Sequence, residues 1–158
     1  MVEPIPAELE GRIVPYLIVE GASDAIDFYQ RAFGAEERVR MPMPDGRIGH
    51  AEIVIGGAYL YLADPPEEQA GYPKSPGALG GTTLLLHRYV EDVDVVVEQA
   101  RLAGATVIRP PSDEFYGDRA AVVEDPFGHL WSIHTHVRDV SPEEMEQAMS
   151  EMASGGDG

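Results

Sequence analysis

The sequence predicts an α+β protein of two βαβββ modules followed by a C-terminal helix. The order strand, helix and three strands occurs twice along the chain. FGAE at 33–36 and AGAT at 103–106 each close a predicted helix, and GGAYLYL at 56–62 and FGHLWSI at 127–133 each open a strand after a turn. Their spacings, 70 and 71 residues, indicate a duplication. The alternative is an ordinary α+β domain with two helices.

The first predicted module covers residues 12–63 and follows a loose arm at 1–11. RIVPYLIVE, at its start, is rich in β-branched and aromatic residues, which favours a strand. Apolar residues then recur at three- and four-residue spacing, which predicts a helix. Ser23 can cap the start of this helix, and Gly34 can end it in a left-handed conformation.

Two turn signals divide the rest of this module into strands. They are PDG at 44–46 and GG at 56–57, which are typical of hairpin turns. The predicted strands are 36–41, 47–55 and 58–63. We therefore expect a three-stranded antiparallel meander after the helix.

A linker at 64–81 separates the modules and contains four prolines and four glycines, so it has no room for a long helix. The second module, 82–138, repeats the order of the first, with its helix ending at Gly104. Residues 139–158 form a C-terminal helix and a frayed tail. Ser141 is the expected cap of that helix, whose methionine-rich stripe is typical of core or of a subunit contact.

One polypeptide with four strands and one helix per module leaves a sheet face uncovered. We therefore expect the two sheets to form a curved eight-stranded mixed sheet around a cleft. Polar side chains that face this cleft are the candidates for a ligand site.

The composition excludes several classes of partner. The formal net charge is −17, with 28 acidic and 11 basic residues, so the surface should repel nucleic acid and anionic membranes. The chain has no cysteine, which rules out disulfides and thiolate catalysis. No signal peptide is recognisable at the N-terminus, and we expect a cytoplasmic protein.

Two pairs of polar residues alternate on predicted strands. His50 and Glu52 share one face of their strand, and Ser132 and His134 share one face of theirs. These side chains fit a hydrogen-bonded pocket wall. The alternative is a displaced metal site built from His50, Glu52 and His134.

The loop EFYGDR, at 114–119, carries a second group of candidates. The aromatic pair Phe115 and Tyr116 suits stacking against a flat ligand. Arg119 could bind a ligand carboxylate or phosphate, or pair with a neighbouring acidic residue. Trp131 points to the opposite face from Ser132, so we expect it to pack against a helix.

The segments VPYLIVEGASDAIDFYQRAFGAE, GHAEIVIGGAYLYLAD, TTLLLHRYVEDVD and YGDRAAVVEDPFGHLWSIHTH resemble the vicinal oxygen chelate superfamily. This superfamily includes glyoxalase I, extradiol dioxygenases and the fosfomycin- and bleomycin-resistance proteins, and the chain looks most similar to its PhnB-like branch. The resemblance covers about residues 12–140 and implies the glyoxalase/bleomycin-resistance fold.

In the metalloenzymes of this superfamily, ligands lie on the first and last strand of each module. The resemblance places Val14 or Tyr16, Tyr61, Thr83 and Ser132 at these positions. Hydroxyl groups are poor ligands for first-row divalent metals, so we expect no metal and no other cofactor, and glyoxalase I activity is not expected.

The sequence therefore predicts a metal-independent protein that binds a small organic ligand and sequesters a toxic compound or metabolite. The resemblance to the superfamily implies a homodimer. The alternative is a metal-dependent lyase, isomerase or dioxygenase with a displaced metal site. The candidate ligand-binding residues are Tyr16, His50, Glu52, Tyr61, Phe115, Tyr116, Arg119, Ser132 and His134.

Overall fold

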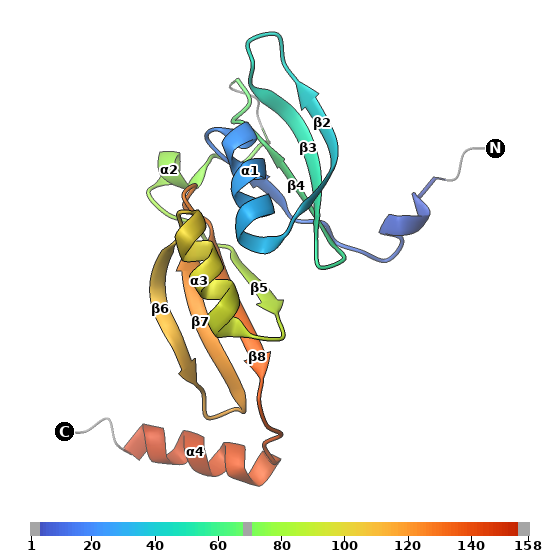
Figure 1. Cartoon of the computed structure of the whole chain (residues 1–158). Coiled ribbons are helices and arrows are strands. Elements are labelled where there is room, and N and C mark those ends of the chain that lie inside the picture. Colours follow the sequence, from blue (N-terminus) through green and yellow to red (C-terminus); the bar gives the residue numbers. More distant parts are fainter. Residues whose placement is uncertain (1–3, 68–70, 155–158) are drawn as a thin grey trace. The chain divides into compact units, whose positions relative to one another are not determined.

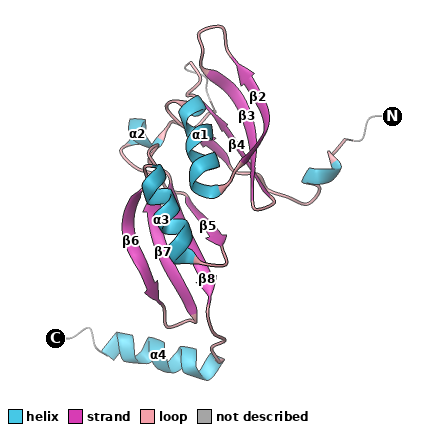
Figure 2. Cartoon of the chain, viewed as in Figure 1, coloured by secondary structure: helices cyan, strands magenta, loops and turns pink. Residues whose placement is uncertain are grey.

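The chain folds into two compact units, residues 1–79 and 80–158. The computed structural model describes residues 4–67 and 71–154. Each unit contains one four-stranded mixed sheet and one long helix between its first two strands, and the second unit also contains the C-terminal helix (Figures 1 and 2). The predicted fold class is confirmed: the protein is α+β, with two βαβββ modules and a C-terminal helix. The curved arrangement of both sheets around one cleft stays a prediction.

In the first unit, a short 3-10 helix, η1 (Ala7–Leu9), precedes the module. The module comprises β1 (Tyr16–Ile18), α1 (Ala22–Phe33), β2 (Glu36–Pro42), β3 (Ile48–Ile55) and β4 (Ala58–Ala63). The sheet order is β1-β4-β3-β2, with β1 parallel to β4 and the other pairs antiparallel. In the described residues of the linker, 64–67 and 71–81, the structure has one helical turn, α2 (Pro76–Leu79), and no long helix, as expected there.

The second unit repeats this topology with the sheet order β5-β8-β7-β6. Its elements are β5 (Leu85–Tyr89), α3 (Val93–Ala103), β6 (Thr106–Asp113), β7 (Asp118–Glu124), β8 (Leu130–His136) and α4 (Pro142–Ser154). Again the first and last strands of the module are parallel. The hydrogen-bonded register therefore supports the duplication independently of the sequence letters.

Each unit has its own apolar core between the long helix and one face of the sheet. In the first unit the aromatic rings of Phe28, Tyr29 and Phe33 contact one another and are buried. In the second unit Val97 on α3 and Ile133 on β8 are buried. Since the helix covers one face, the polar side chains that alternate with these core residues lie on the other face.

The start of α1 is stabilised from a distant strand and not by its own sequence. Gly21 is the N-cap and makes no side-chain cap, so the prediction that Ser23 caps this helix is wrong. Asp64, directly after β4, accepts hydrogen bonds from the N–H groups of Gly21 (2.8 Å) and Ala22 (3.1 Å) on one carboxylate oxygen. Its other oxygen accepts from Ile48 N–H at 2.7 Å. One carboxylate thus ties the helix to two strands.

The second unit uses an equivalent residue, Thr135, which lies 71 positions after Asp64. The Thr135 hydroxyl accepts from Val93 N–H at 2.9 Å, at the start of α3, and donates to Val90 O at 3.0 Å. Val93 itself is 71 positions after Ala22. The junction between the last strand and the helix is therefore duplicated in position and in chemistry.

The DPFGHLW segment forms a turn organised by one carboxylate. Asp125 accepts hydrogen bonds from Phe127 N–H and His129 N–H, both at 3.0 Å, and from the indole N–H of Trp131 at 3.0 Å. Trp131 is 4% exposed. As predicted, it is packed in the interior, and the motif has a structural role that needs no ligand.

The C-terminal helix α4 begins with a capping box. Glu144 N–H donates to the Ser141 hydroxyl at 3.2 Å, and Ser141 N–H donates to the Glu144 carboxylate at 2.9 Å, so the predicted cap is confirmed. None of the residues of α4 is buried within the described part of the chain. The methionine stripe is therefore not core there, and its use as a subunit contact stays a prediction. Among the described residues, no helix is both long and apolar enough to cross a membrane.

Candidate functional site

Four predicted site residues meet on the open face of the first sheet. The Tyr16 hydroxyl lies 2.8 Å from Nδ1 of His50, and Nε2 of His50 lies 3.2 Å from a carboxylate oxygen of Glu52. The Tyr61 ring contacts both Tyr16 and His50 edge-on, with centroid distances of 6.0 and 5.1 Å. Tyr61 is the register partner of both Tyr16 on β1 and Glu52 on β3, which explains this clustering.

The Glu52 carboxylate fixes the direction of the hydrogen bonds in this cluster. An ionised carboxylate only accepts hydrogen bonds, so Nε2 of His50 must carry the proton that it donates. In the neutral imidazole, Nδ1 is then the acceptor for the Tyr16 hydroxyl proton. The lone pairs of the Tyr16 oxygen remain for another partner. Burial raises the pKa of Tyr16, and the neighbouring Tyr72 adds to the rise, so its hydroxyl stays protonated at neutral pH.

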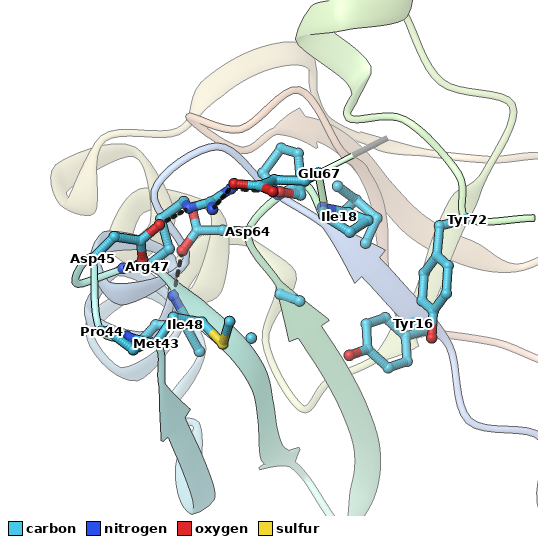
Figure 3. A pocket seen from close by; sticks show the side chains of 14 residues that line it. Tyr16, Ile18, Met43, Pro44, Asp45, Arg47, Ile48, Asp64, Glu67 and Tyr72 are labelled. Atoms are coloured by element: carbon cyan, nitrogen blue, oxygen red, sulfur yellow. Dashed lines mark hydrogen bonds and ion pairs between the residues drawn. The ribbon is translucent and has the colours of Figure 1, made fainter. Parts of the chain in front are cut away.

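Tyr16 also lines a pocket of about 430 Å³ within the first unit (Figure 3). Its aromatic and apolar walls include Tyr72 from the linker, Ile18 from β1 and Met43 from the β2–β3 hairpin. In Figure 3 the Tyr16 hydroxyl is directed toward the space between the two tyrosines and the charged residues across from them. A volume of this size is within the range of small-molecule sites.

The opposite wall of the pocket is charged. Arg47 donates to Asp45 at 2.7 Å, to the carbonyl oxygen of Pro65 at 3.2 Å and to Glu67 at 3.4 Å (Figure 3). The contact with Arg47 lowers the pKa of Asp45. Asp64, which ties α1 to the sheet, also lines this wall. Three of the five N–H donors of the Arg47 guanidinium are thus used within the wall itself.

The open face of the second sheet carries a different polar cluster, centred on Asp118. The Asp118 carboxylate is 4% exposed. One of its oxygens accepts from the Tyr89 hydroxyl at 2.7 Å and lies 3.0 Å from Nδ1 of His134, while the other lies 2.9 Å from Nδ1 of His136. Burial raises the pKa of Asp118, but the hydrogen bonds from Tyr89, His136 and His134 outweigh it and lower the pKa to about 2.

Ser132 and His134 extend this cluster along β8. The Ser132 hydroxyl lies 2.8 Å from Nε2 of His134, whose Nδ1 faces Asp118. Both residues are buried. The exposed His87 ring lies 4.2 Å from that of His134, and burial together with the charge of His134 lowers the pKa of His87. Both units therefore hold a hydroxyl–imidazole–carboxylate chain.

The pocket and the Asp118 cluster occupy equivalent places in the two modules. Ile18 pairs with Ala63 in the β1–β4 register, and Tyr89 pairs with His134 in the equivalent β5–β8 register. Ile18 and Ala63 line the pocket, whereas Tyr89 and His134 bear directly on Asp118. The smaller side chains of the first module leave space where the second module is filled.

The remaining predicted candidates lie in the second unit. The Tyr116 ring is stacked on His134 with a centroid distance of 6.3 Å, and Phe115 contacts Tyr116 edge-on. Arg119 pairs with Asp94 at 2.6 Å and with Asp113 at 3.0 Å. Of the two roles predicted for Arg119, the structure shows the pairing with acidic neighbours.

One position carried over from the resemblance is corrected by the register. Thr83 lies before β5 and outside the sheet. The residue of β5 that pairs with Ser132 is His87, just as Tyr16 pairs with Tyr61 in the first unit. The first-strand position of the second module is therefore His87. Adding the repeat offset of 71 to Tyr16 would have found it.

The residues at the superfamily's metal positions do not fit a divalent metal. Three of them, Tyr16, Tyr61 and Ser132, offer hydroxyl groups, and only His87 offers an imidazole. Within residues 4–67 and 71–154, no three His, Asp or Glu side chains are grouped so that they could hold a metal ion. In the alternative set, His50 and Glu52 already bond to each other, and both ring nitrogens of His134 already have partners in Ser132 and Asp118.

The sequence did not single out several residues that shape these sites. Met43, Arg47 and Tyr72 come from a hairpin and from the linker, where no periodicity marks a side chain as facing a pocket. Asp118 follows a glycine and resembles a turn residue in the sequence, but it opens β7 and is buried. Tyr89 could have been found as the alternate residue to His87 on the same strand.

Comparisons with known proteins agree with this fold. The family model described as "Glyoxalase/Bleomycin resistance protein/Dioxygenase superfamily" matches residues 11–133. The uncharacterized protein Mb0911c of Mycobacterium bovis is 44% identical over 148 residues, which are 93% of this chain and 97% of that protein. The crystal structure of TioX from Micromonospora sp. ML1 has a TM-score of 0.65 at 28% identity and covers 80% of this chain and 99% of TioX. The fosfomycin resistance protein FosX from Listeria monocytogenes has a TM-score of 0.61 at 20% identity, covers 85% of this chain and 97% of FosX, and so shares the fold alone.

Proposed function

Because the chain belongs to the Glyoxalase/Bleomycin resistance protein/Dioxygenase superfamily, we propose that it binds a small organic molecule in the pocket of its first unit, without a metal ion. The observation that carries this proposal is the pocket of about 430 Å³ with Tyr16 and Tyr72 in its wall. Members of this superfamily bind small molecules, which supports ligand binding in general terms. Sequestration of a toxic compound or metabolite is the role that we propose.

The lining of the pocket is suited to a flat apolar body with one polar group. Ile18 and Met43 offer apolar surface, and the two tyrosines offer ring faces for stacking. The Tyr16 oxygen offers lone pairs to a polar group of the ligand, because its proton is directed to His50. A few polar atoms within an apolar wall are typical of sites that orient a ligand.

The proposal does not depend on the second unit. The Ser132, His134 and Asp118 side chains there are buried and bonded to one another. We assign this cluster to the stability of the second module. Phe115 and Tyr116 remain candidates for further ligand contacts, and a homodimer in the cytoplasm remains part of the proposal.

The experiment is a thermal-shift screen of aromatic compounds against the whole chain and two tyrosine variants. A ligand present at a hundred times its Kd adds about 2.7 kcal/mol to the stability of the folded state. Tyr72→Ala should abolish the shift, because Tyr72 lines the pocket and is 56% exposed, so the fold does not need it. Tyr59→Ala, on β4 but outside the pocket lining, is the control and should keep the shift. Loss of the shift in neither variant, or in both, would contradict the proposal.

The hydrogen-bonded side chains of Tyr16, His50 and Glu52 favour a second candidate function, that of a lyase, isomerase or dioxygenase that uses a divalent metal at a displaced site. The donors present do not fit that metal without breaking these hydrogen bonds. Metal analysis of protein purified without chelator separates the two functions. Stoichiometric Zn, Ni, Mn or Fe that is lost in His50→Ala would favour the enzyme and overturn the metal-independent proposal.

A further inference from the structure

We propose that the ligand of the first-unit pocket is an organic cation, an amine carried on an aromatic or apolar body. This inference rests on the proposed function and names the chemical class that the same pocket selects. Three features carry it: the balance of charge in the wall, the direction of the Tyr16 hydroxyl, and the ring faces of Tyr16 and Tyr72.

The pocket wall has an excess of negative charge. Asp45, Asp64 and Glu67 line it, and Arg47 is the one basic residue among the described lining residues. Three carboxylates against one guanidinium leave a net charge of −2. The formal charge of the whole chain, −17, has the same sign. An amine cation entering this pocket is therefore attracted by both the local and the overall field.

Three of the five N–H donors of Arg47 are already used within the charged wall. Arg47 directs Nε to Asp45, one terminal nitrogen to the carbonyl oxygen of Pro65 and the other to Glu67. A carboxylate or phosphate ligand would find only the two remaining N–H groups of Arg47, on a guanidinium that already pairs with Asp45 and Glu67. It would also lie beside carboxylates of the same charge, which disfavours its ionised form.

Acceptors, in contrast, remain available. With His50 neutral, the Tyr16 proton is directed to Nδ1, so the Tyr16 oxygen can only accept a hydrogen bond from a ligand. The Asp64 carboxylate accepts two backbone N–H groups on Oδ1 and one on Oδ2, so a lone pair of Oδ2 remains for a donor of the ligand, and these contacts hold the carboxylate in place. An ammonium group carries up to three N–H donors and no acceptor, which matches this wall.

The aromatic walls favour the same ligand class. Tyr16 and Tyr72 both line the pocket, and Figure 3 shows their side chains together on the side away from Arg47. The face of a tyrosine ring attracts a cation, and it also packs against an apolar body. One molecule that carries both an ammonium group and a ring or chain can use the two properties together.

The test compares three probes of similar shape by isothermal titration calorimetry: phenethylamine, 3-phenylpropionate and the neutral 3-phenylpropanol. We expect the amine to bind at least about tenfold more tightly than the carboxylate, a preference that added salt reduces. Equal or tighter binding of the carboxylate or of the alcohol would overturn the cation inference and leave the pocket as a general ligand site. Binding of none of the three, together with a negative screen of aromatic compounds, would overturn the proposed function as well.

Charge variants locate the effect in the pocket. Glu67→Gln removes one carboxylate from the lining, and its side chain is 89% exposed, so folding should not change. Glu143→Gln removes the same charge from exposed helix α4 in the other unit. We expect the amine to bind about two- to fivefold more weakly to the Glu67 variant alone. Equal weakening in both variants would assign the preference to the overall charge and overturn a cation site in this pocket.

Discussion

Replacing Asp118 by asparagine should destabilise the protein at neutral pH, because three side chains depend on this one buried carboxylate. Tyr89, His134 and His136 all bond to it. The carboxyl pKa falls from its ordinary 3.8 to about 2 in the folded chain, which corresponds to roughly 2 kcal/mol of stability. Asparagine removes the charge and turns one acceptor into a donor that faces other donors. We therefore expect a loss of about 2–3 kcal/mol.

Urea denaturation of both proteins at several pH values measures this loss. A carboxyl whose folded pKa is depressed contributes stability that is present above its unfolded pKa and is lost as the pH falls toward the folded value. With 3.8 and about 2, roughly half of the contribution should have gone by pH 3. The control is Asp139→Asn, which removes an exposed carboxylate that also bonds to His136 and should change stability little. Equal stability of wild type and Asp118→Asn at pH 7, or a difference that does not narrow in acid, would refute the reasoning.

Three further predictions follow from single contacts. NMR titration of His136 should give a midpoint above 6.5, because the carboxylates of Asp118 and Asp139 raise its pKa, and the midpoint should drop in Asp118→Asn. The protonated His136 ring contributes stability that is complete below pH 6.5 and is lost as the pH rises through the higher folded pKa. Gly117→Ala should lower the free energy of unfolding in urea by about 2 kcal/mol or more, because φ is +97° and an added Cβ would lie 2.2 Å from the carbonyl oxygen of Arg138. Gly46→Ala is the control: φ is +88° but the space around it is open, so the loss should be smaller. Asp64→Ala should cost about 2–4 kcal/mol because three backbone N–H groups lose their acceptor, and an unchanged denaturation midpoint would contradict this role.

The sequence was sufficient for features that depend on neighbouring residues. The turn at Gly56 and Gly57 has positive φ at both positions, as a tight hairpin requires, and the C-terminal helix begins at the predicted cap, Ser141. The order of strands and helices in the modules could be predicted because the same pattern of turns and helix ends occurs twice in the sequence. These features are local, so a short window of residues contains the physical cause of each.

The features that sequence reasoning missed are those in which distant residues meet. Ser23 has the chemistry of a cap, but Asp64 satisfies the start of that helix from 42 positions away. The sequence left two roles open for Arg119, and its partner Asp94, 25 positions before it, could not be identified from the sequence. Thr83 is a different case, because it lies before β5 and the repeat offset from Tyr16 points to His87 in the sequence itself. Tertiary contacts decided the cases of Ser23 and Arg119, and a single sequence does not contain those contacts explicitly.

The lining of the candidate site could be predicted only in part. Tyr16, His50, Glu52 and Tyr61 come together as expected because alternation on strands and parallel pairing of the outer strands are general rules. The charged wall depends on Arg47 and on linker residues, whose side-chain directions follow no period. The pocket was therefore predictable on its strand side and not on its loop side.

Duplication explains why one module can carry a pocket and the other a polar cluster. Ile48 opens β3 and Asp118 opens β7, at equivalent places in the two sheets. A buried carboxylate needs several donors, and Tyr89 and His134 supply them by filling the space above the sheet. The apolar side chain of Ile48 needs no hydrogen-bond donor, so the space beside it can stay open.

If smaller side chains replaced Tyr89 and His134, the second module would gain open space, but Asp118 would lose these two donors, and the fold would be destabilised. The first module keeps its pocket open without this loss, because Ile48 stands at the position equivalent to Asp118. The two roles therefore separate by unit. Asp118→Asn should weaken the fold and leave amine binding unchanged at temperatures where the variant is folded, and Tyr72→Ala should abolish binding and leave the fold intact. A single variant that reduced both the stability of the fold and the affinity for the amine to the same extent would contradict this separation of stability and binding between the two modules.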